Sequence, residues 1–159
     1  MAIQPARPSL LRDPVHLLAF GFGAGLSPYA PGTIGTLIAV PIVILVAQFG
    51  WITHLAFALA ACFGGVYLCG ESARRLDVHD HPGIVWDEIA GYTVTMLAAP
   101  TEPLWLLVGF LLFRFFDIVK PSPIREADHS LRGGLGIMLD DIIAGVFAGA
   151  ILLAIRLLT

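Results

Sequence analysis

The stretch WITHLAFALAACFGGVYLCG, residues 51–70, decides the fold class of this chain. Twenty residues in a helix rise about 30 Å, which matches the hydrocarbon thickness of a bilayer. The stretch contains no Asp, Glu, Lys or Arg, and His54 has no obvious polar partner within it. The sequence therefore predicts that residues 51–70 form a helix that crosses a membrane.

The composition of the whole chain agrees with this interpretation. Of the 159 residues, 57% are hydrophobic and 13% are charged, and the mean hydropathy is +0.85. Soluble domains average about 25% charged residues, so the apolar excess is too large for one small water-soluble core. We expect an integral membrane protein with a single domain over residues 1–159. The net charge of −3 argues against a broad nucleic-acid-binding face.

Further apolar stretches lie on both sides of residues 51–70. Residues 15–26 are too few to cross about 30 Å of hydrocarbon, so they are predicted to form an interfacial or re-entrant helix. The other predicted spans are residues 34–50, 84–99, 104–116 and 139–158. The predicted fold is all-α, a polytopic membrane helical bundle with about four to five spans.

The basic residues indicate how the bundle is oriented. Seven of the nine Lys and Arg residues lie in segments that an alternating path places on one side of the membrane. The turns near residue 50 and at residues 100–103 contain neither Lys nor Arg. Because cytoplasmic loops are enriched in basic residues, the side with those seven is predicted to be cytoplasmic.

Two pairs of acidic residues open apolar helices on that same side. They are Asp87 and Glu88 in WDEIAG, and Asp140 and Asp141 in LDDIIAG. A helix dipole favours an acid in the first turn, and this alone explains one acid. Two acids beside a membrane are costly to desolvate without a cation. We therefore predict that one acid of each pair faces a shared site while the other braces the loop.

Polar residues after the fourth span extend this predicted site. Asp117 ends the span, and Arg114 three residues earlier offers it an ordinary ion pair. Lys120 and Arg125 follow in KPSPIR. These two basic side chains either hold a phosphate or anchor the chain to lipid headgroups.

Two loops contain further candidates. Residues 23–36 are dense in Gly and Pro and carry Thr33 and Thr36, and exposed amides in such a loop can cradle an anion. Asp80 lies seven residues before Asp87 and is placed to swing toward the same point. The sequence therefore brings a possible anion site next to the acids.

Acid groups that converge at the edge of a bilayer most often bind a hard metal ion, a polar headgroup, or both. A membrane enzyme and a small divalent-cation transporter or binding protein both fit this pattern. The acids lie at one face and leave no acidic path through the middle of the bilayer, which favours the enzyme. A purely structural subunit would leave the paired acids unexplained.

Four motifs in order resemble the phosphatidylglycerophosphatase A family. They are GFGAGLSPYAPGTIGTL, DHPGIVWDEIAGY, FRFFDIVKPSPIREAD and GGLGIMLDDIIAG, which together extend from about residue 21 to about residue 150. The resemblance implies a Mg²⁺-dependent phosphatase of the bacterial inner membrane. Such an enzyme hydrolyses phosphatidylglycerophosphate to phosphatidylglycerol and phosphate, with its active site facing the cytoplasm.

The resemblance also implies roles for individual residues. The catalytic acids would be Asp80, Asp87, Glu88, Asp117 and Asp141. The metal ligands would be drawn from Asp87, Glu88, Asp117, Asp140 and Asp141. The phosphate would be held by Thr33, Thr36, Lys120 and Arg125. The chain departs from the family pattern at His81 and His129. Attack by water and an aspartyl-phosphate intermediate are both compatible with the sequence.

Overall fold

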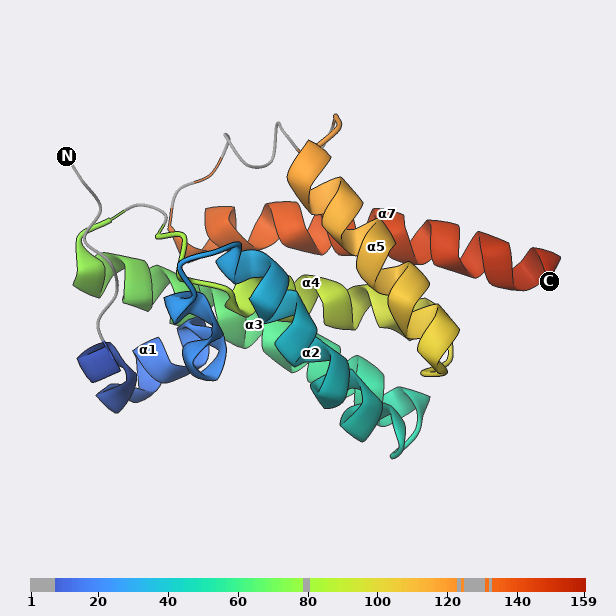
Figure 1. Ribbon diagram of the computed structural model, residues 1–159, viewed down its shortest axis with the longest axis horizontal. Helices are drawn as coiled ribbons and strands as arrows, with labels where there is room; N and C mark the ends of the chain where they lie inside the picture. The colour runs from blue at the N-terminus through green and yellow to red at the C-terminus, as the bar shows by residue number, and fades with distance from the viewer. Residues whose placement is uncertain (1–7, 79–80, 123, 125–130, 132) are drawn as a thin grey trace.

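The chain folds into helices, as the sequence predicts. The computed structural model describes residues 8–78, 81–122, 124, 131 and 133–159, and no strand occurs among them. The N-terminal part consists of the 3₁₀ helix η1 (Pro8–Arg12), the short helix α1 (Pro14–Ala19) and the 3₁₀ helix η2 (Gly21–Leu26). The bundle that follows, drawn in Figure 1, contains α2 (Pro31–Ala47), α3 (Trp51–Leu76), α4 (Trp86–Thr95), η3 (Met96–Ala98), α5 (Pro103–Val119) and α7 (Gly134–Leu158).

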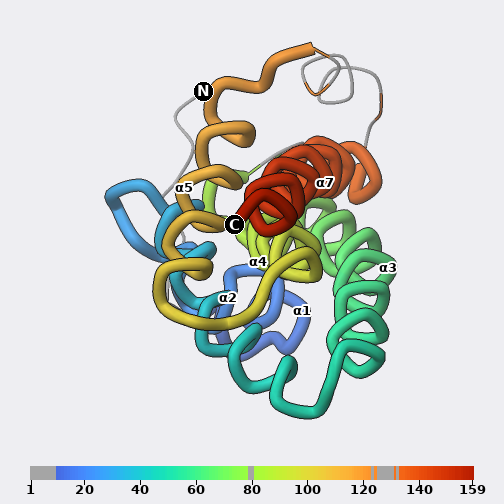
Figure 2. Tube along the Cα trace, turned by 90° about the vertical axis from the view of Figure 1, so that its right-hand side faces the viewer, coloured from blue at the N-terminus to red at the C-terminus, as the bar shows by residue number. Residues whose placement is uncertain are grey.

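Helix α4 lies at the centre of the bundle. Helices α2, α3, α5 and α7 all pack against it, and Figure 2 shows it enclosed between them. Tyr92 and Met96 on this part of the chain join Phe113 of α5 and Leu152 of α7 in one buried apolar cluster. The helix that begins with the first predicted acidic pair is therefore surrounded by other helices.

Polar side chains inside the bundle find partners on neighbouring helices. The Tyr92 hydroxyl donates to the Leu106 carbonyl at 2.9 Å, and Trp86 Nε1 donates to the Ala61 carbonyl at 3.0 Å. Where water is excluded, such hydrogen bonds satisfy groups that would otherwise be costly. They also fix the rotation of α4 relative to α5 and α3.

Helices α3 and α7 are long and apolar enough to cross a membrane. They have 26 and 25 residues, and only 28% and 33% of their most apolar windows are buried inside the protein. Large apolar side chains such as Phe63 and Leu153 are exposed on them. These two apolar helices indicate association with a membrane. Helices α2 and α5 are shorter, with 17 residues each.

The helix boundaries differ from the predicted ones in the polar segments. Helix α2 begins at Pro31, three residues before the predicted start, because proline is preorganised for the first helical position. Helix α3 continues past residue 70 to Leu76, and Arg74 and Arg75 in its last turn complement the helix dipole. Helix α7 begins at Gly134 rather than at residue 139. The PGTIGT motif is thus the first turn and a half of a helix.

The N-terminal stretch that was predicted as one short helix is broken. Helix α1 ends at Ala19, and within η2 Phe22 and Gly23 have φ values of 57° and 104°. This left-handed backbone is easy for Gly23 and unusual for Phe22. Residues 15–26 therefore fold as two short pieces, neither of them long enough to cross a bilayer.

Helix α7 makes close contacts with two other helices at glycines. A Cβ atom at Gly134 would lie 1.8 Å from the Val66 carbonyl oxygen of α3. A Cβ atom at Gly145 would lie 2.4 Å from the Gly91 carbonyl oxygen of α4. The absence of side chains at these positions lets the backbones touch, as is typical of membrane helix packing.

Candidate metal centre

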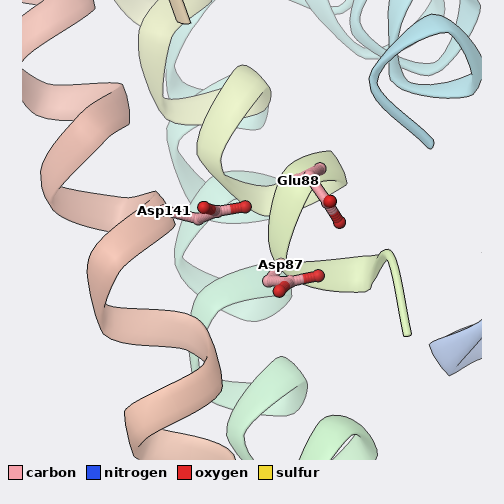
Figure 3. A group of neighbouring side chains, drawn as sticks. All are labelled: Asp87, Glu88 and Asp141. Atoms are coloured by element: carbon pink, nitrogen blue, oxygen red, sulfur yellow. The ribbon is translucent and has the colours of Figure 1, made fainter. Parts of the chain in front are cut away.

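Three acidic side chains from two helices meet inside the bundle. Asp87 and Glu88 lie in the first turn of α4, and Asp141 lies about two turns into α7. One ligand oxygen of each residue lies within 4.8 Å of the others. Figure 3 shows Asp141 pointing from α7 toward the start of α4. We call Asp87, Glu88 and Asp141 the carboxylate cluster.

The close approach of α4 and α7 explains why these acids meet. Gly91 and Gly145 touch, and one helical turn before each of them stand Asp87 and Asp141. Residues four apart lie on the same face of a helix, so the contact that joins the glycines also brings the two acids together. Glu88 follows Asp87 in the same turn and faces α2 and α5.

Each member of the carboxylate cluster has a buried oxygen that lacks a hydrogen-bond partner within the described part of the chain. These oxygens are Asp87 Oδ1, Glu88 Oε2 and Asp141 Oδ2. Burying ionised carboxylates without compensation costs several kcal/mol, and a bound cation removes that cost. Carboxylate oxygens are the ligands that Mg²⁺ prefers in proteins. The donor set therefore fits a hard divalent cation.

The two other predicted metal ligands, Asp117 and Asp140, lie against basic side chains. Lys120 Nζ donates to Asp140 Oδ2 at 2.5 Å, at the junction of α5 and α7. Arg114 donates to Asp117, one helical turn later on α5. Asp117 also lies beside Asp141 of the carboxylate cluster. Basic side chains of the protein thus balance the charges of Asp117 and Asp140. Lys120, which was predicted to bind phosphate, forms an ion pair with Asp140.

The first turn of α2 closes one side of the site. A Cβ atom at Gly32 would lie 2.1 Å from Glu88 Oε1 and 3.2 Å from Arg114 Nη1, so a side chain here would displace the ends of these two side chains. Thr33 follows Gly32 in the same turn. The Thr36 hydroxyl is buried and donates to the Gly32 carbonyl at 2.9 Å. The predicted anion loop is therefore adjacent to the carboxylate cluster, and the substrate roles of Thr33 and Thr36 stay predictions.

Two of the predicted site residues, Asp80 and Arg125, lie outside the described residues. Their roles also stay predictions. His81, where the sequence departs from the family pattern, is buried, and its Nδ1 accepts the Gly83 N–H at 3.0 Å. Its ring packs on that of Phe20. This histidine shapes the turn that leads into α4.

The sequence reasoning missed two residues of the site. Arg114 was interpreted as the partner of Asp117 alone, but its Nη1 also lies 3.9 Å from Glu88 Oε1. Gly32 was interpreted as part of a Gly- and Pro-rich loop, but it lies in the first turn of α2, next to Glu88 Oε1. A lone Arg inside the apolar stretch 104–116 was the available signal for the first. The Gly- and Pro-dense segment 23–36 was a signal for a close backbone approach at Gly32, but it did not identify Glu88 as the partner.

Comparison with known proteins places the chain in a family. Residues 17–156 match the phosphatidylglycerophosphatase A family. The chain belongs to the phosphatidylglycerophosphatase A family. The matched residues include the carboxylate cluster and the helices that hold it. The resemblance that the four motifs indicated is thereby confirmed.

Individual relatives cover most of the chain. The phosphatidylglycerophosphatase A of Escherichia coli strain K12 is 48% identical over 144 residues, which are 89% of this chain and 83% of that protein. The phosphatidylglycerophosphatase A of Haemophilus influenzae is 44% identical over 154 residues, 96% of this chain and 94% of that protein. A candidate phosphatidylinositol-3-phosphatase of Bacteroides thetaiotaomicron is 39% identical over 153 residues, 89% of this chain and 91% of that protein. No solved structure matches the chain.

Proposed function

We propose that this member of the phosphatidylglycerophosphatase A family is a lipid phosphatase that hydrolyses phosphatidylglycerophosphate to phosphatidylglycerol and phosphate. The family match and the two relatives with that name support the activity. The observation that carries the chemistry is the carboxylate cluster, with three buried oxygens that lack partners among the described residues. A phosphomonoester dianion cannot approach such a cluster unless a cation offsets its charge.

The carboxylate cluster is the proposed binding site for Mg²⁺. Asp87, Glu88 and Asp141 would hold the ion, while Asp117 and Asp140 act from beside it, because each already contacts a basic side chain. Bound there, Mg²⁺ would supply charge neutralisation at the phosphoryl oxygens and a lowered pKa for attacking water. We propose a single ion. The three unpartnered carboxylate oxygens would fill half of its octahedral coordination shell and leave the other positions for water and substrate.

The protein itself would position the phosphate. Helix α2 presents its N-terminal turn, with Thr33, next to Glu88, and the positive end of a helix favours an anion. Arg125 is a further proposed phosphate ligand, and Lys120 contributes through its pair with Asp140. Asp80, seven residues before Asp87 in the sequence, is a further proposed catalytic acid. The group that attacks the phosphorus is either water or an aspartate.

The proposed location is the bacterial inner membrane, with several spans and the active site at the cytoplasmic side. Helices α3 and α7 have the length to cross, and α2 and α5, at 17 residues, reach most of the way when packed beside them. The cluster lies at the end of the bundle that carries the basic segments. In this arrangement the acyl chains of the substrate stay in the bilayer while its headgroup reaches the site.

Phosphate release from a panel of lipid phosphomonoesters, with and without Mg²⁺, tests this function. Phosphatidylglycerophosphate should be the preferred substrate, phosphatidylinositol 3-phosphate and phosphatidic acid should react more slowly, and removal of Mg²⁺ should stop the reaction. Asp87→Asn should lower kcat/KM by more than about 100-fold, because it removes a ligand of the proposed ion. The matched control is Glu102→Gln, at the opposite end of α5, which should keep normal activity.

Two results would reject the proposal. The first is Mg²⁺-independent hydrolysis that Asp87→Asn leaves intact. The second is divalent-cation flux through reconstituted vesicles without release of phosphate, which would favour a transporter. The stereochemical course at phosphorus separates the two attacking groups, since direct attack by water inverts the configuration and an aspartyl-phosphate intermediate, with two successive displacements, retains it.

A further inference from the structure

Arg114 is a largely buried cation beside the carboxylate cluster, and the proposed function assigns it no role. It lies on α5 between Phe113 and Phe115, and its side chain is 14% exposed. A guanidinium carries five N–H donors in a rigid fork and is never deprotonated in a protein. Burying it costs free energy that only nearby acceptors can offset. The acids around Arg114 therefore explain its position on this helix.

Arg114 connects two acids from different helices. It donates to Asp117 on its own helix α5, and its Nη1 lies 3.9 Å from Oε1 of Glu88 on α4. The ion pair with Asp117 follows from spacing, because residues three apart are neighbours on a helix. The contact with Glu88 does not follow from spacing, because it depends on how α5 packs against α4.

The two oxygens of Glu88 have different surroundings. Oε1 faces Arg114 and the backbone at Gly32, where a Cβ atom would lie only 2.1 Å away. Oε2 is buried and has no partner among the described residues. Arg114, at ion-pair distance, and the first turn of α2 thus flank one oxygen of Glu88, and the other is left for the carboxylate cluster.

We propose that Arg114 is a positioning residue of the metal centre. Anchored by Asp117, it holds Glu88 Oε1 and thereby fixes Glu88 in the orientation that leaves Oε2 for the metal ion. Partners that orient metal ligands in this way contribute substantially to metal affinity. The inference rests on the proposed function, because it assumes that the carboxylate cluster binds a divalent cation.

The sign of one measurement separates this role from simple charge balance. By Coulomb's law alone, removal of a positive charge beside an anionic site should tighten the binding of a cation. If Arg114 instead positions Glu88, its removal should weaken that binding, because a ligand loses its fixed orientation. A residue that contacts only the substrate phosphate would change KM for the lipid and leave metal binding unaltered.

The experiment is a Mn²⁺ titration of the full chain in detergent, followed by electron paramagnetic resonance, combined with steady-state kinetics. Arg114→Gln should weaken Mn²⁺ binding by about tenfold or more and lower kcat more than it changes KM. Arg114→Lys should recover part of the loss, because lysine keeps the charge but offers no rigid fork. Thermal unfolding in EDTA checks that each variant is folded, and Glu102→Gln serves as the control.

The outcomes are distinct. Tighter or unchanged Mn²⁺ binding in folded Arg114→Gln would overturn the positioning role, as would a rise in KM alone. Should Arg114→Gln fail to fold, Arg114→Lys decides, and normal Mn²⁺ binding with normal kcat in that variant would overturn the role as well. If the unsubstituted chain binds no Mn²⁺, the metal assignment in the proposed function is wrong, and this inference falls with it.

Discussion

Asp141 is 3% exposed, and its Oδ2 has no partner among the described residues, which makes it a costly residue for the fold without an ion. Asp87, Glu88 and Asp117 all lie near it, so like charges add to the cost of burial. Because burial of this carboxylate lowers stability, we expect Asp141 to serve binding or catalysis.

This cost predicts opposite effects of Asp141→Asn on stability and function. In EDTA the variant should unfold at a temperature higher by about 2–4 °C, because one buried charge is removed. In the presence of Mg²⁺ it should lose the stabilisation that the ion gives to the unsubstituted chain, together with phosphate release. Thermal unfolding with and without Mg²⁺ measures both effects. A lower unfolding temperature in EDTA would contradict this account of Asp141.

His16 on α1 is a second buried polar residue, and it lies outside the helices that are proposed to span the membrane. Its Nδ1 is 2.8 Å from the Ser72 hydroxyl of α3, and the side chain is 5% exposed. Burial is the main cause that lowers the pKa of His16 below its usual 6.5, with Arg75 and His81 acting in the same direction and Asp13 and Glu71 opposing. The contact attaches the N-terminal segment to the end of α3.

The lowered pKa predicts a stability that depends on pH. Below pH 6.5 the unfolded chain binds a proton at His16 that the folded chain does not bind, so stability falls as pH decreases from 6.5 through the folded-state pKa. His16→Asn should flatten this part of the curve while leaving the stability above pH 7 lower by a constant amount. Unfolding temperatures between pH 5 and 8 test it, and an equal slope in both proteins would refute it.

At the scale of elements, the packing of α7 against α3 depends on a glycine. A Cβ atom at Gly134 would lie 1.8 Å from the Val66 carbonyl oxygen, and neither backbone can move without separating the helices. Gly134→Ala should therefore cost about 1–3 kcal/mol of stability. Gly64→Ala on α3 is the matched control, since nothing lies within 4 Å of its Cβ position. It should be neutral or stabilise by about 0.5–1 kcal/mol.

Equilibrium unfolding of both variants in mixed micelles gives the comparison. A similar free energy of unfolding for Gly134→Ala and for the unsubstituted chain would show that α3 and α7 pack less closely than described. The activity of Gly134→Ala should fall as well, because α7 carries Asp141 to the carboxylate cluster.

Sequence reasoning succeeded where a segment is uniform and failed where the outcome depends on packing. Residues 51–70 and 142–155 contain no charged residue, so the cores of α3 and α7 were predictable. The two acidic pairs could be recognised as parts of one site. Which member of the second pair joins the carboxylate cluster depends on the rotation of α7, and glycine contacts with α3 and α4 set that rotation. Gly145 and Gly149 are four residues apart and both face α4, a spacing typical of membrane helix packing, but this spacing does not identify the partner helix.

At the scale of the whole molecule, a short central helix is held by longer ones. Helix α4 with η3 extends from Trp86 to Ala98, which is about 20 Å and too short to cross a bilayer alone. The surrounding helices bury it and place its acidic N-terminal turn near one end of the bundle. This placement supports the proposal that the site is reached from one side of the membrane.

The proposed orientation can be tested by labelling. In a variant without Cys62 and Cys69, a cysteine at the exposed Glu102 position should react with an impermeant maleimide added outside intact spheroplasts. A cysteine at the exposed Arg74 position should react only after the membrane is opened, because it lies on the predicted cytoplasmic side. Labelling of both from outside, or the reverse pattern, would contradict the orientation.

The central claim is that acids from α4 and α7 share one divalent cation, and a Mn²⁺ titration of the purified chain tests it most directly. We predict one tight site in the unsubstituted chain, its loss in both Asp87→Asn and Asp141→Asn, and its retention in Glu102→Gln. Unchanged Mn²⁺ binding in the two Asn variants would contradict the account, because the two helices would then not contribute to the same ion site.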